Sequence, residues 1–264
     1  MQRKMCGDGS RGFFAVLLAA LLIGQVSSCG SKDDSFGGQE TVLELPRMSF
    51  SVRIYEADKR CRALLLFASG DGGWKAFEDK ICRYLATRGL CVVGWDCRKF
   101  AEPGLYDQKV LAAGFAAALD EARRITGVRD VPVVFSGYST GAEQAVAAAA
   151  ASPRQSSLVG LLLIAPAERG RYGLTTSDLM GITPVGKGSF GLSDLALGLA
   201  GLRIVQIHGE HDPLDSTEWL DGLTTPHQLK TYPDGWHFFK GGPPDFLNLL
   251  ADAIDWILSP AGKS

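Results

Sequence analysis

Short apolar runs alternate with amphipathic segments over residues 41–260. Around Pro46, apolar and polar residues alternate in two short stretches, which predicts an opening antiparallel pair of strands. Further along, continuous apolar runs recur, as expected for strands that are buried on both faces of a sheet. The predicted strands are Thr41–Leu45, Ser49–Tyr55, Ala63–Ala68, Cys91–Asp96, Val131–Ser136, Leu158–Ala165, Arg203–His208 and Gln228–Tyr232.

Helical spacing separates most of these runs. Phe77, Ile81 and Leu85 recur every four residues, and Gly89 ends the helix that they predict. The irregular, glycine-rich segment 168–201 is expected to cross the C-terminal edge of the sheet, where open α/β folds bind ligands. Strands that alternate with helices predict an α/β fold, with a mostly parallel sheet covered by helices on both faces. The other predicted helices are Lys109–Thr126, Ala142–Ala151 and Asp245–Leu258.

The first 28 residues have the pattern of a secretory signal. Basic residues precede an apolar segment at 13–26, and residues 26–29 (VSSC) resemble a bacterial lipobox. We therefore expect cleavage before Cys29 and lipidation of that cysteine. The product would be an envelope lipoprotein, in the outer membrane and facing the periplasm or the cell surface. An uncleaved membrane anchor is the alternative, but the apolar segment is shorter than the ~20 residues that span a bilayer.

Residues 29–40 are small, polar and glycine-rich, which is typical of a flexible tether. Such a segment reaches at most roughly 40 Å, so it would keep the domain at 41–260 close to the membrane. In an oxidising compartment, the four cysteines of this domain predict one or two structural disulfides. Three pairings are open for Cys61, Cys82, Cys91 and Cys97.

The composition is that of a folded domain, with 46% hydrophobic and 21% charged residues. Lys and Arg number 27 against 29 Asp and Glu, so the formal net charge is −2. A chain with this balance has no basic field, and we expect no nucleic-acid partner.

Ser139 is the candidate nucleophile, in the motif Gly137-Tyr138-Ser139-Thr140-Gly141. The motif alone is a weak signal, because glycine and serine are common in this chain. Here a predicted strand runs into it and an alanine-rich helix leaves it, which is the setting of a nucleophile elbow. The serine Oγ would then lie beside the N–H groups of a helix N-terminus. An ordinary serine in a glycine-rich turn is the alternative.

A serine nucleophile needs a base, and the base needs an acid that orients it. In this fold, the chain order is serine, acid, histidine. His237 follows the last predicted strand and precedes the final helix, so we expect its imidazole to reach toward Ser139. A surface histidine in a binding patch is the alternative. Asp212, just after the preceding strand, is the first choice for the acid, with Asp215 and Glu210 as alternatives.

An oxyanion needs two backbone donors. Thr140 N–H is expected to be one of them. The loop Ser69–Trp74 follows the first buried strand, and its glycines allow close approach to a ligand. We expect the second donor to be the N–H of Asp71, or else that of Gly72. A plain tight turn is the alternative reading of this loop.

Two other motifs point to no cofactor. His208 and His211 lie among carboxylates, but side chains in a run at a strand end diverge, so we expect no metal site. Residues 181–188 resemble a phosphate-binding loop, but they lack the Ser or Thr that binds magnesium, and no strand precedes them.

Four segments carry a more specific pattern: 69–74 (SGDGGW), 92–96 (VVGWD), 137–143 (GYSTGAE) and 235–238 (GWHF). Together they resemble the VirJ/AcvB family of bacterial virulence proteins, from about Ala63 to Leu258. The SGDGGW loop is the most specific part. The resemblance implies an α/β-hydrolase fold in the cell envelope. Members of the AcvB branch hydrolyse lysyl-phosphatidylglycerol, and VirJ-type members are associated with a secretion apparatus.

The chain departs from the family pattern at Thr140, Glu143 and Trp236, which are close to the expected pocket. The expected function is hydrolysis of a carboxylic ester by a membrane-tethered serine hydrolase, with aminoacylated phospholipid as the leading substrate. A broad small-ester esterase is the second hypothesis, and a non-catalytic adaptor with envelope protein partners is the third. An adaptor has no physical need for a complete triad.

A lysyl amine would need carboxylates beside the pocket, and Asp71, Asp96 and Glu143 are the candidates. Each has a structural alternative: Asp71 as a helix cap, Asp96 as a partner of a loop amide, and Glu143 in the first turn of a helix. Trp74 and Tyr138 are further candidate substrate contacts.

Overall fold

The computed structural model describes residues 36–153, 157–237 and 244–259. These residues belong to one compact unit, Phe36–Ser264, which has its own hydrophobic core. The predicted signal, Cys29 and the first part of the tether lie outside the described residues. The first strand begins at Gln39, inside the segment that was predicted to be tether.

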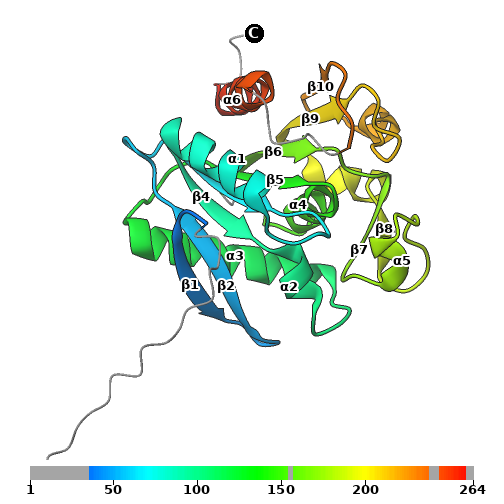
Figure 1. The fold of residues 1–264 in the computed structure, drawn as a ribbon, viewed down its shortest axis with the longest axis horizontal. Helices are drawn as coiled ribbons and strands as arrows, with labels where there is room; N and C mark the ends of the chain where they lie inside the picture. Colours follow the sequence, from blue (N-terminus) through cyan, green and yellow to red (C-terminus); the bar gives the residue numbers. More distant parts are fainter. Residues whose placement is uncertain (1–35, 154–156, 238–243, 260–264) are drawn as a thin grey trace, which may run out of the picture. The chain divides into compact units, whose positions relative to one another are not determined.

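Eight strands form one sheet in the order β1-β2-β4-β3-β5-β6-β9-β10 among the described residues (Figure 1). β2 is antiparallel to both of its neighbours, and every other pair is parallel, as predicted. The strands are β1 (Gln39–Glu44), β2 (Ser49–Tyr55), β3 (Ala63–Ala68), β4 (Leu90–Trp95), β5 (Val133–Tyr138), β6 (Leu158–Ile164), β9 (Arg203–Gly209) and β10 (His227–Tyr232).

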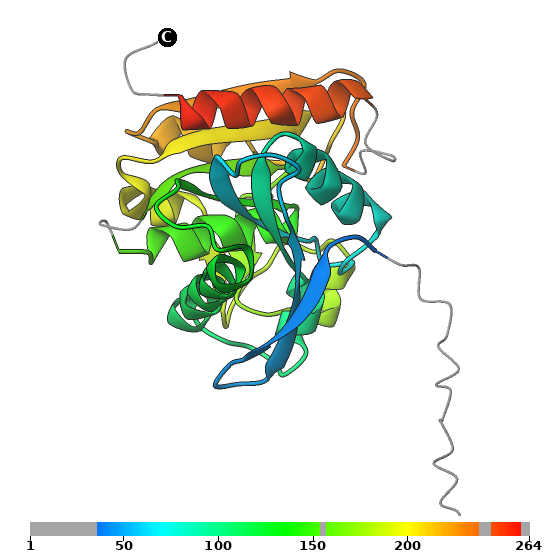
Figure 2. The same ribbon diagram turned by 90° about the vertical axis from the view of Figure 1, so that its left-hand side faces the viewer.

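Helices cover both faces of this sheet, which confirms the predicted three-layer arrangement (Figure 2). α1 (Ala76–Thr87) and α6 (Pro244–Leu258) lie on one face, and α3 (Gln108–Thr126) and α4 (Thr140–Ala150) lie on the other. A short helix, α2 (Cys97–Ala101), connects β4 to the loop before α3. Gly127 ends α3 in the left-handed conformation that glycine tolerates best, with φ of 68°.

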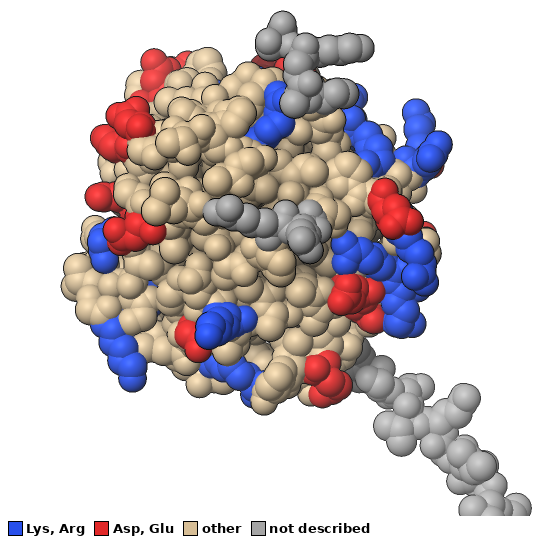
Figure 3. Space-filling view, turned by 180° about the vertical axis from the view of Figure 1, so that it is seen from behind, with Lys and Arg blue, Asp and Glu red and all other residues tan. Residues whose placement is uncertain are grey.

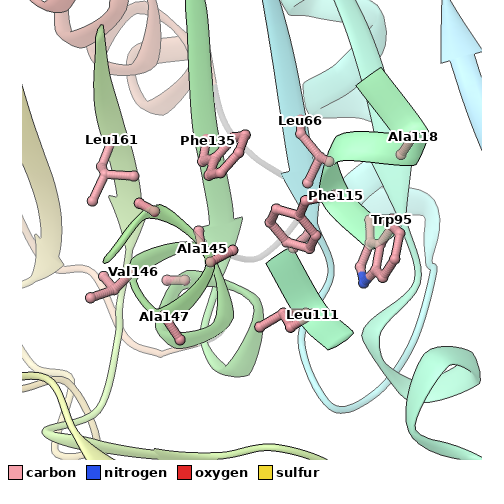
Figure 4. Packing of buried hydrophobic residues seen from close by; sticks show 14 of the residues in the cluster. Leu66, Trp95, Leu111, Phe115, Ala118, Phe135, Ala145, Val146, Ala147 and Leu161 are labelled. Atoms are coloured by element: carbon pink, nitrogen blue, oxygen red, sulfur yellow. The ribbon is translucent and has the colours of Figure 1, made fainter. Parts of the chain in front are cut away.

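The larger core lies between the sheet and α3 and α4 (Figure 4). Phe115 of α3 packs edge-on against Phe135 of β5 and against Trp95 of β4, with ring centroids 5.2 and 5.0 Å apart. α4 presents mostly alanines and Val146 to the same core, and these small side chains let the helix lie close to β5. Each large buried side chain contributes about 1.5–3 kcal/mol to this packing.

The segment between β6 and β9 is more regular than its sequence predicts. It holds a small hairpin, β7 (Arg169–Arg171) with β8 (Ser189–Gly191), and the short helix α5 (Thr176–Leu179) between them. Two 3-10 helices follow, η1 (Ser193–Leu199) before β9 and η2 (Glu218–Gly222) after it. Local capping explains α5, because Thr175 and Asp178 form a reciprocal capping box that starts it.

The four cysteines in the described part of the chain are free thiols, so the prediction of one or two disulfides is wrong for this structure. Cys82 packs in the core on the α1 face and Cys97 in the core on the α3 face, so the sheet separates them. The thiols of Cys61 and Cys91 hydrogen-bond to each other, and this bond lowers the pKa of Cys61 to about 7. Among the disulfide pairings left open by the sequence, the pair Cys61 and Cys91 is the one whose thiols are in contact in the described residues.

On the reverse face of the molecule, acidic and basic side chains are interspersed and leave a broad uncharged region between them (Figure 3). That face therefore carries no continuous patch of one sign. Within the described residues, no helix has the length and the apolar character needed to cross a bilayer.

Candidate active site

Ser139 lies in a strained turn between β5 and α4. Its φ is 52°, a value that residues other than glycine rarely adopt. The turn is closed by Ser139 N–H, which donates to the carbonyl of Ile164 in β6 at 2.8 Å. Gly137 and Gly141 make this turn sterically possible. A Cβ on Gly137 would overlap the backbone of Gly141, and a Cβ on Gly141 would overlap the backbone of Ala68.

Three predicted side chains meet at this turn in one line of hydrogen bonds. His237 Nε2 lies 3.1 Å from Ser139 Oγ, and His237 Nδ1 lies 2.8 Å from Asp212 Oδ2. The three residues come from segments that follow β5, β9 and β10, as the chain order predicts. This is the arrangement in which an imidazole accepts a serine proton while a carboxylate fixes its tautomer.

Asp212 is held as a carboxylate by its surroundings. Its side chain is fully buried, and its Oδ1 accepts hydrogen bonds from the N–H groups of Leu214 and Asp215. Burial alone would raise the pKa of Asp212. The hydrogen bonds from His237 and from these two N–H groups more than offset burial, so the pKa lies below its ordinary value.

The two alternative acids are engaged elsewhere. Asp215 binds His208 Nδ1 at 2.8 Å and the Gln206 amide at 2.8 Å, and burial raises its pKa to about 7. Glu210 is exposed and accepts a hydrogen bond from Asp234 N–H. Among the three candidate acids, Asp212 is thus the carboxylate that contacts His237.

The two expected oxyanion donors lie on the wall of one pocket. Thr140 is the first residue of α4, so its N–H has no carbonyl acceptor within the helix. The loop before α1 turns tightly, with Gly73 N–H donating to the Gly70 carbonyl at 3.1 Å. Asp71 and Gly72 of this loop line the same pocket as Ser139 and Thr140. The structure therefore brings the loop and the elbow together.

Asp96 and Trp74, two of the predicted substrate contacts, do not line this pocket. Asp96 caps α2 by accepting from Lys99 N–H and also accepts from Trp74 N–H at 3.2 Å. The Trp74 ring packs on Gly94, where a Cβ would overlap it, and stacks on Tyr55. Both side chains thus hold the loop 69–74 against β4, and the structure does not place them in the pocket where substrate contacts were expected.

Tyr138 lines the pocket, but its hydroxyl also has a structural role. It donates to the backbone carbonyl of His237 at 2.8 Å, and its ring packs edge-on against Phe77 of α1. The tyrosine therefore connects the elbow to the histidine loop.

The pocket in front of Ser139 has a volume of about 510 Å³. Its wall carries more acidic than basic side chains. The acidic ones are Asp71, Glu78, Glu143 and Asp178, and the basic ones are Lys75 and Arg169.

The sequence is matched by the family model described as bacterial virulence protein (VirJ) over residues 62–254, most of the chain. The chain belongs to the VirJ family. The resemblance noted in the sequence is therefore confirmed. No match was found among curated proteins.

Solved structures with a similar fold are α/β-hydrolases, which confirms the predicted fold. An α/β serine hydrolase homologue from Coxiella burnetii shares 15% identity, with a TM-score of 0.59 over 81% of this chain and 96% of its own. The esterase domain of a Rhodothermus marinus protein shares 16% identity, with a TM-score of 0.59 over 83% and 97%. A thermostable carboxyl esterase from Bacillus coagulans shares 14% identity, with a TM-score of 0.63 over 84% and 99%.

Two pocket carboxylates of this VirJ family member were missed in the sequence. Glu78 is buried, accepts from Lys75 N–H at the start of α1, and has its pKa raised by burial. Asp178 Oδ2 accepts from Arg171 and Thr175, whereas its buried Oδ1 has no hydrogen-bond partner. In the sequence, Glu78 and Asp178 each stand three positions after the residue that starts a helix. An acidic residue at this position predicts a helix cap rather than the wall of a pocket.

One group of metal-ligand type is present among the described residues. Glu210, His211 and Asp234 bring three such atoms within 4.8 Å of one another, and all three side chains are exposed. His208, the other histidine of this run, is bound to Asp215 instead. The two histidines therefore point to different partners, as expected from their strand-end position.

Glu143 is the third buried pocket carboxyl, and it makes the stability of the fold depend on pH. Its Oε1 accepts from Ala167 N–H, and burial raises its pKa to about 8 from an ordinary value of 4.5. The folded state thus favours the protonated form. This contribution is complete below pH 4.5 and is lost as pH rises toward 8, by at most about 1.4 kcal/mol per pH unit.

We therefore expect the melting temperature of the wild type to fall between about pH 4.5 and about pH 8, and that of Glu143→Gln to fall less. The amide is uncharged throughout and keeps an acceptor for Ala167 N–H. Thermal unfolding at several pH values checks this, with Glu102→Gln, an exposed glutamate outside the pocket, as the matched control. Parallel pH profiles for the wild type and Glu143→Gln would contradict the assignment.

Proposed function

We propose that this chain is a membrane-tethered serine hydrolase of carboxylic esters, and that its substrate is an aminoacyl ester on a phospholipid headgroup. The observation that supports this proposal is the series of hydrogen bonds from Asp212 through His237 to Ser139, at a pocket whose wall carries more acidic than basic side chains. The fold and the family are consistent with it. The proposed anchor is the lipidated Cys29.

The proposed reaction has two steps. Ser139 Oγ attacks the ester carbonyl carbon while His237 Nε2 takes its proton, and Asp212 stabilises the imidazolium that forms. The carbonyl oxygen becomes an oxyanion held by the N–H groups of Thr140 and Asp71. His237 then gives its proton to the leaving headgroup oxygen, and the acyl group stays on Ser139.

Water completes the cycle. His237 takes a proton from a water molecule, whose oxygen attacks the acyl carbon and forms a second oxyanion at the same donors. When that intermediate collapses, the bond to Ser139 Oγ breaks, Oγ takes the proton from His237, and the amino acid leaves as a carboxylic acid that loses its remaining proton to solvent. The residues are then back in their starting protonation states.

The acidic wall fits a positively charged acyl group. An ammonium beside Glu143 would favour the ionised carboxylate and lower its pKa, so binding of a lysyl group offsets the cost of burying that charge. A neutral acyl group of the same size receives no such contribution.

We therefore expect kcat/KM to be higher for a lysyl ester than for an alanyl or butyryl ester. Glu143→Gln and Asp71→Asn should each narrow the lysyl preference by about tenfold, the value of one charge-assisted hydrogen bond. Both should lower butyryl turnover by much less. Glu102→Gln should leave the preference unchanged, since this residue does not line the pocket.

The measurement is the initial rate on the three esters with one common leaving alcohol, so that only the acyl group varies. Equal rates on all three would leave a general esterase and remove the aminoacyl-lipid substrate. No turnover on any of them would favour the adaptor hypothesis.

A further inference from the structure

Five apolar side chains are exposed around the mouth of the pocket, and we call them the apolar rim. They are Leu179, Met180, Ile182, Val185 and Leu214. Met180 and Val185 are 73% and 69% exposed, and each directly follows in sequence a residue that lines the pocket, Leu179 and Pro184 respectively. Leu179, Ile182 and Leu214 also line the pocket itself. The apolar surface is thus continuous with the entrance for substrate.

The rim is held in place by polar contacts on its inner side. Arg171 donates to Asp178 Oδ2 at 2.8 Å and to the carbonyls of Val185 and Lys187 at 3.1 and 2.5 Å. Arg169 donates to the carbonyl of Pro184 at 3.1 Å. The segment around α5, at the right-hand edge of Figure 1, is therefore fixed in place, and its apolar side chains are exposed. Loose packing does not explain their exposure.

The predicted lipid anchor joins the domain close to this opening. Gly37 N–H donates to Asp79 Oδ1 in α1 at 2.6 Å, and the preceding residue of α1, Glu78, lines the pocket. The chain therefore enters the fold about one helical turn from the pocket wall. Six residues lie between Cys29 and Phe36, and the seven Cα–Cα steps that join these two residues reach at most roughly 25 Å. A bilayer that holds Cys29 lies within that distance of this end of α1.

We propose that the apolar rim docks on the surface of a phospholipid bilayer. This inference rests on the proposed function, because a headgroup ester is the substrate that such docking would deliver. In the docked state, the rim side chains enter the boundary between headgroups and acyl chains. The exposed Lys187, next to the rim, lies at the level of the lipid phosphates. The pocket mouth then opens onto the headgroups, and the ester reaches Ser139 without extraction of the lipid.

The test is flotation with vesicles of phosphatidylglycerol and phosphatidylethanolamine. The protein is the mature chain from residue 29 with Cys29→Ser and Ser139→Ala, so that neither the anchor nor turnover contributes. Met180→Ser with Val185→Ser removes rim side chains that do not line the pocket. Leu197→Ser, 85% exposed in η1, is the matched control. Melting temperatures establish that all variants are folded.

We expect the parent and the Leu197→Ser control to float with the vesicles. The rim variant should bind at least about tenfold more weakly, because two partly inserted apolar side chains are lost. Equal binding by the parent and the rim variant would overturn the proposal, as would a parent that does not bind. A dimer that the rim substitutions dissociate, without vesicle binding by the parent, would assign the rim to self-association instead.

The two proposals fail separately. Vesicle binding is measured here with Ser139→Ala, so it does not depend on catalysis. If the rim is needed for vesicle binding but Ser139→Ala retains ester turnover, the serine mechanism is excluded and the proposal that the rim docks on a bilayer is still supported.

Discussion

Replacing Ser139 with alanine should lower ester turnover by at least about 10³-fold and abolish labelling by a fluorophosphonate probe. The Oγ that this change removes is the atom that lies 3.1 Å from His237 Nε2. One hydroxyl is lost from a turn that the backbone holds, so the melting temperature should stay nearly the same. Ser193→Ala, an exposed serine of η1, is the matched control and should change neither measurement.

The other two members of the line should act as part of the same unit. Ester turnover by His237→Ala should fall to a level similar to that of Ser139→Ala. Asp212→Asn should also lower ester turnover by several orders of magnitude, because Asp215 is bound to His208 and cannot replace the lost carboxylate. Wild-type turnover by Ser139→Ala would exclude the serine mechanism altogether.

The largest effect on stability is expected from Gly137→Ala. The added Cβ would overlap the backbone of Gly141, and neither side of that contact is a flexible side chain that can move away. The turn must open, which costs about 3 kcal/mol or more. For a domain of this size we expect a fall in melting temperature of roughly 10 °C.

Turnover should fall with the stability of Gly137→Ala, because opening the turn moves Ser139 away from His237. The control is Gly222→Ala, where an added Cβ meets no atom within 4 Å. Thermal unfolding and ester turnover of the two variants check the prediction. A Gly137→Ala protein with the melting temperature and activity of the wild type would show that the elbow is not sterically constrained.

The strands, and the meeting of Ser139, Asp212 and His237, could be predicted because each depends on a local signal. A strand buried on both faces has no polar side, so an apolar run such as Ala63–Ala68 identifies it directly. Ser139, Asp212 and His237 each follow a predicted strand at the same edge of a parallel sheet. Chain topology therefore brings them together without any knowledge of side-chain packing.

The structure differs from the sequence-based expectations at residues where the direction of the side chain decides what it contacts. Asp96 also follows a strand, yet its carboxylate turns toward the N–H groups of Trp74 and Lys99 and away from the pocket. Glu78 and Asp178 reach the pocket only because α1 and the α5 segment fold over it. Such placements depend on contacts between distant segments, and the spacing of residues in the sequence does not encode them.

The hydroxyl of Tyr138 has a consequence for how the site moves. Tyr138 directly precedes Ser139 in the chain, and its hydroxyl donates to the backbone carbonyl of His237 at 2.8 Å. An aromatic ring does not stretch, so it acts as a spacer of constant length between the elbow and the histidine loop. As long as this hydrogen bond is intact, it limits how far the histidine loop can separate from the elbow, and so preserves the short distance between Ser139 Oγ and His237 Nε2.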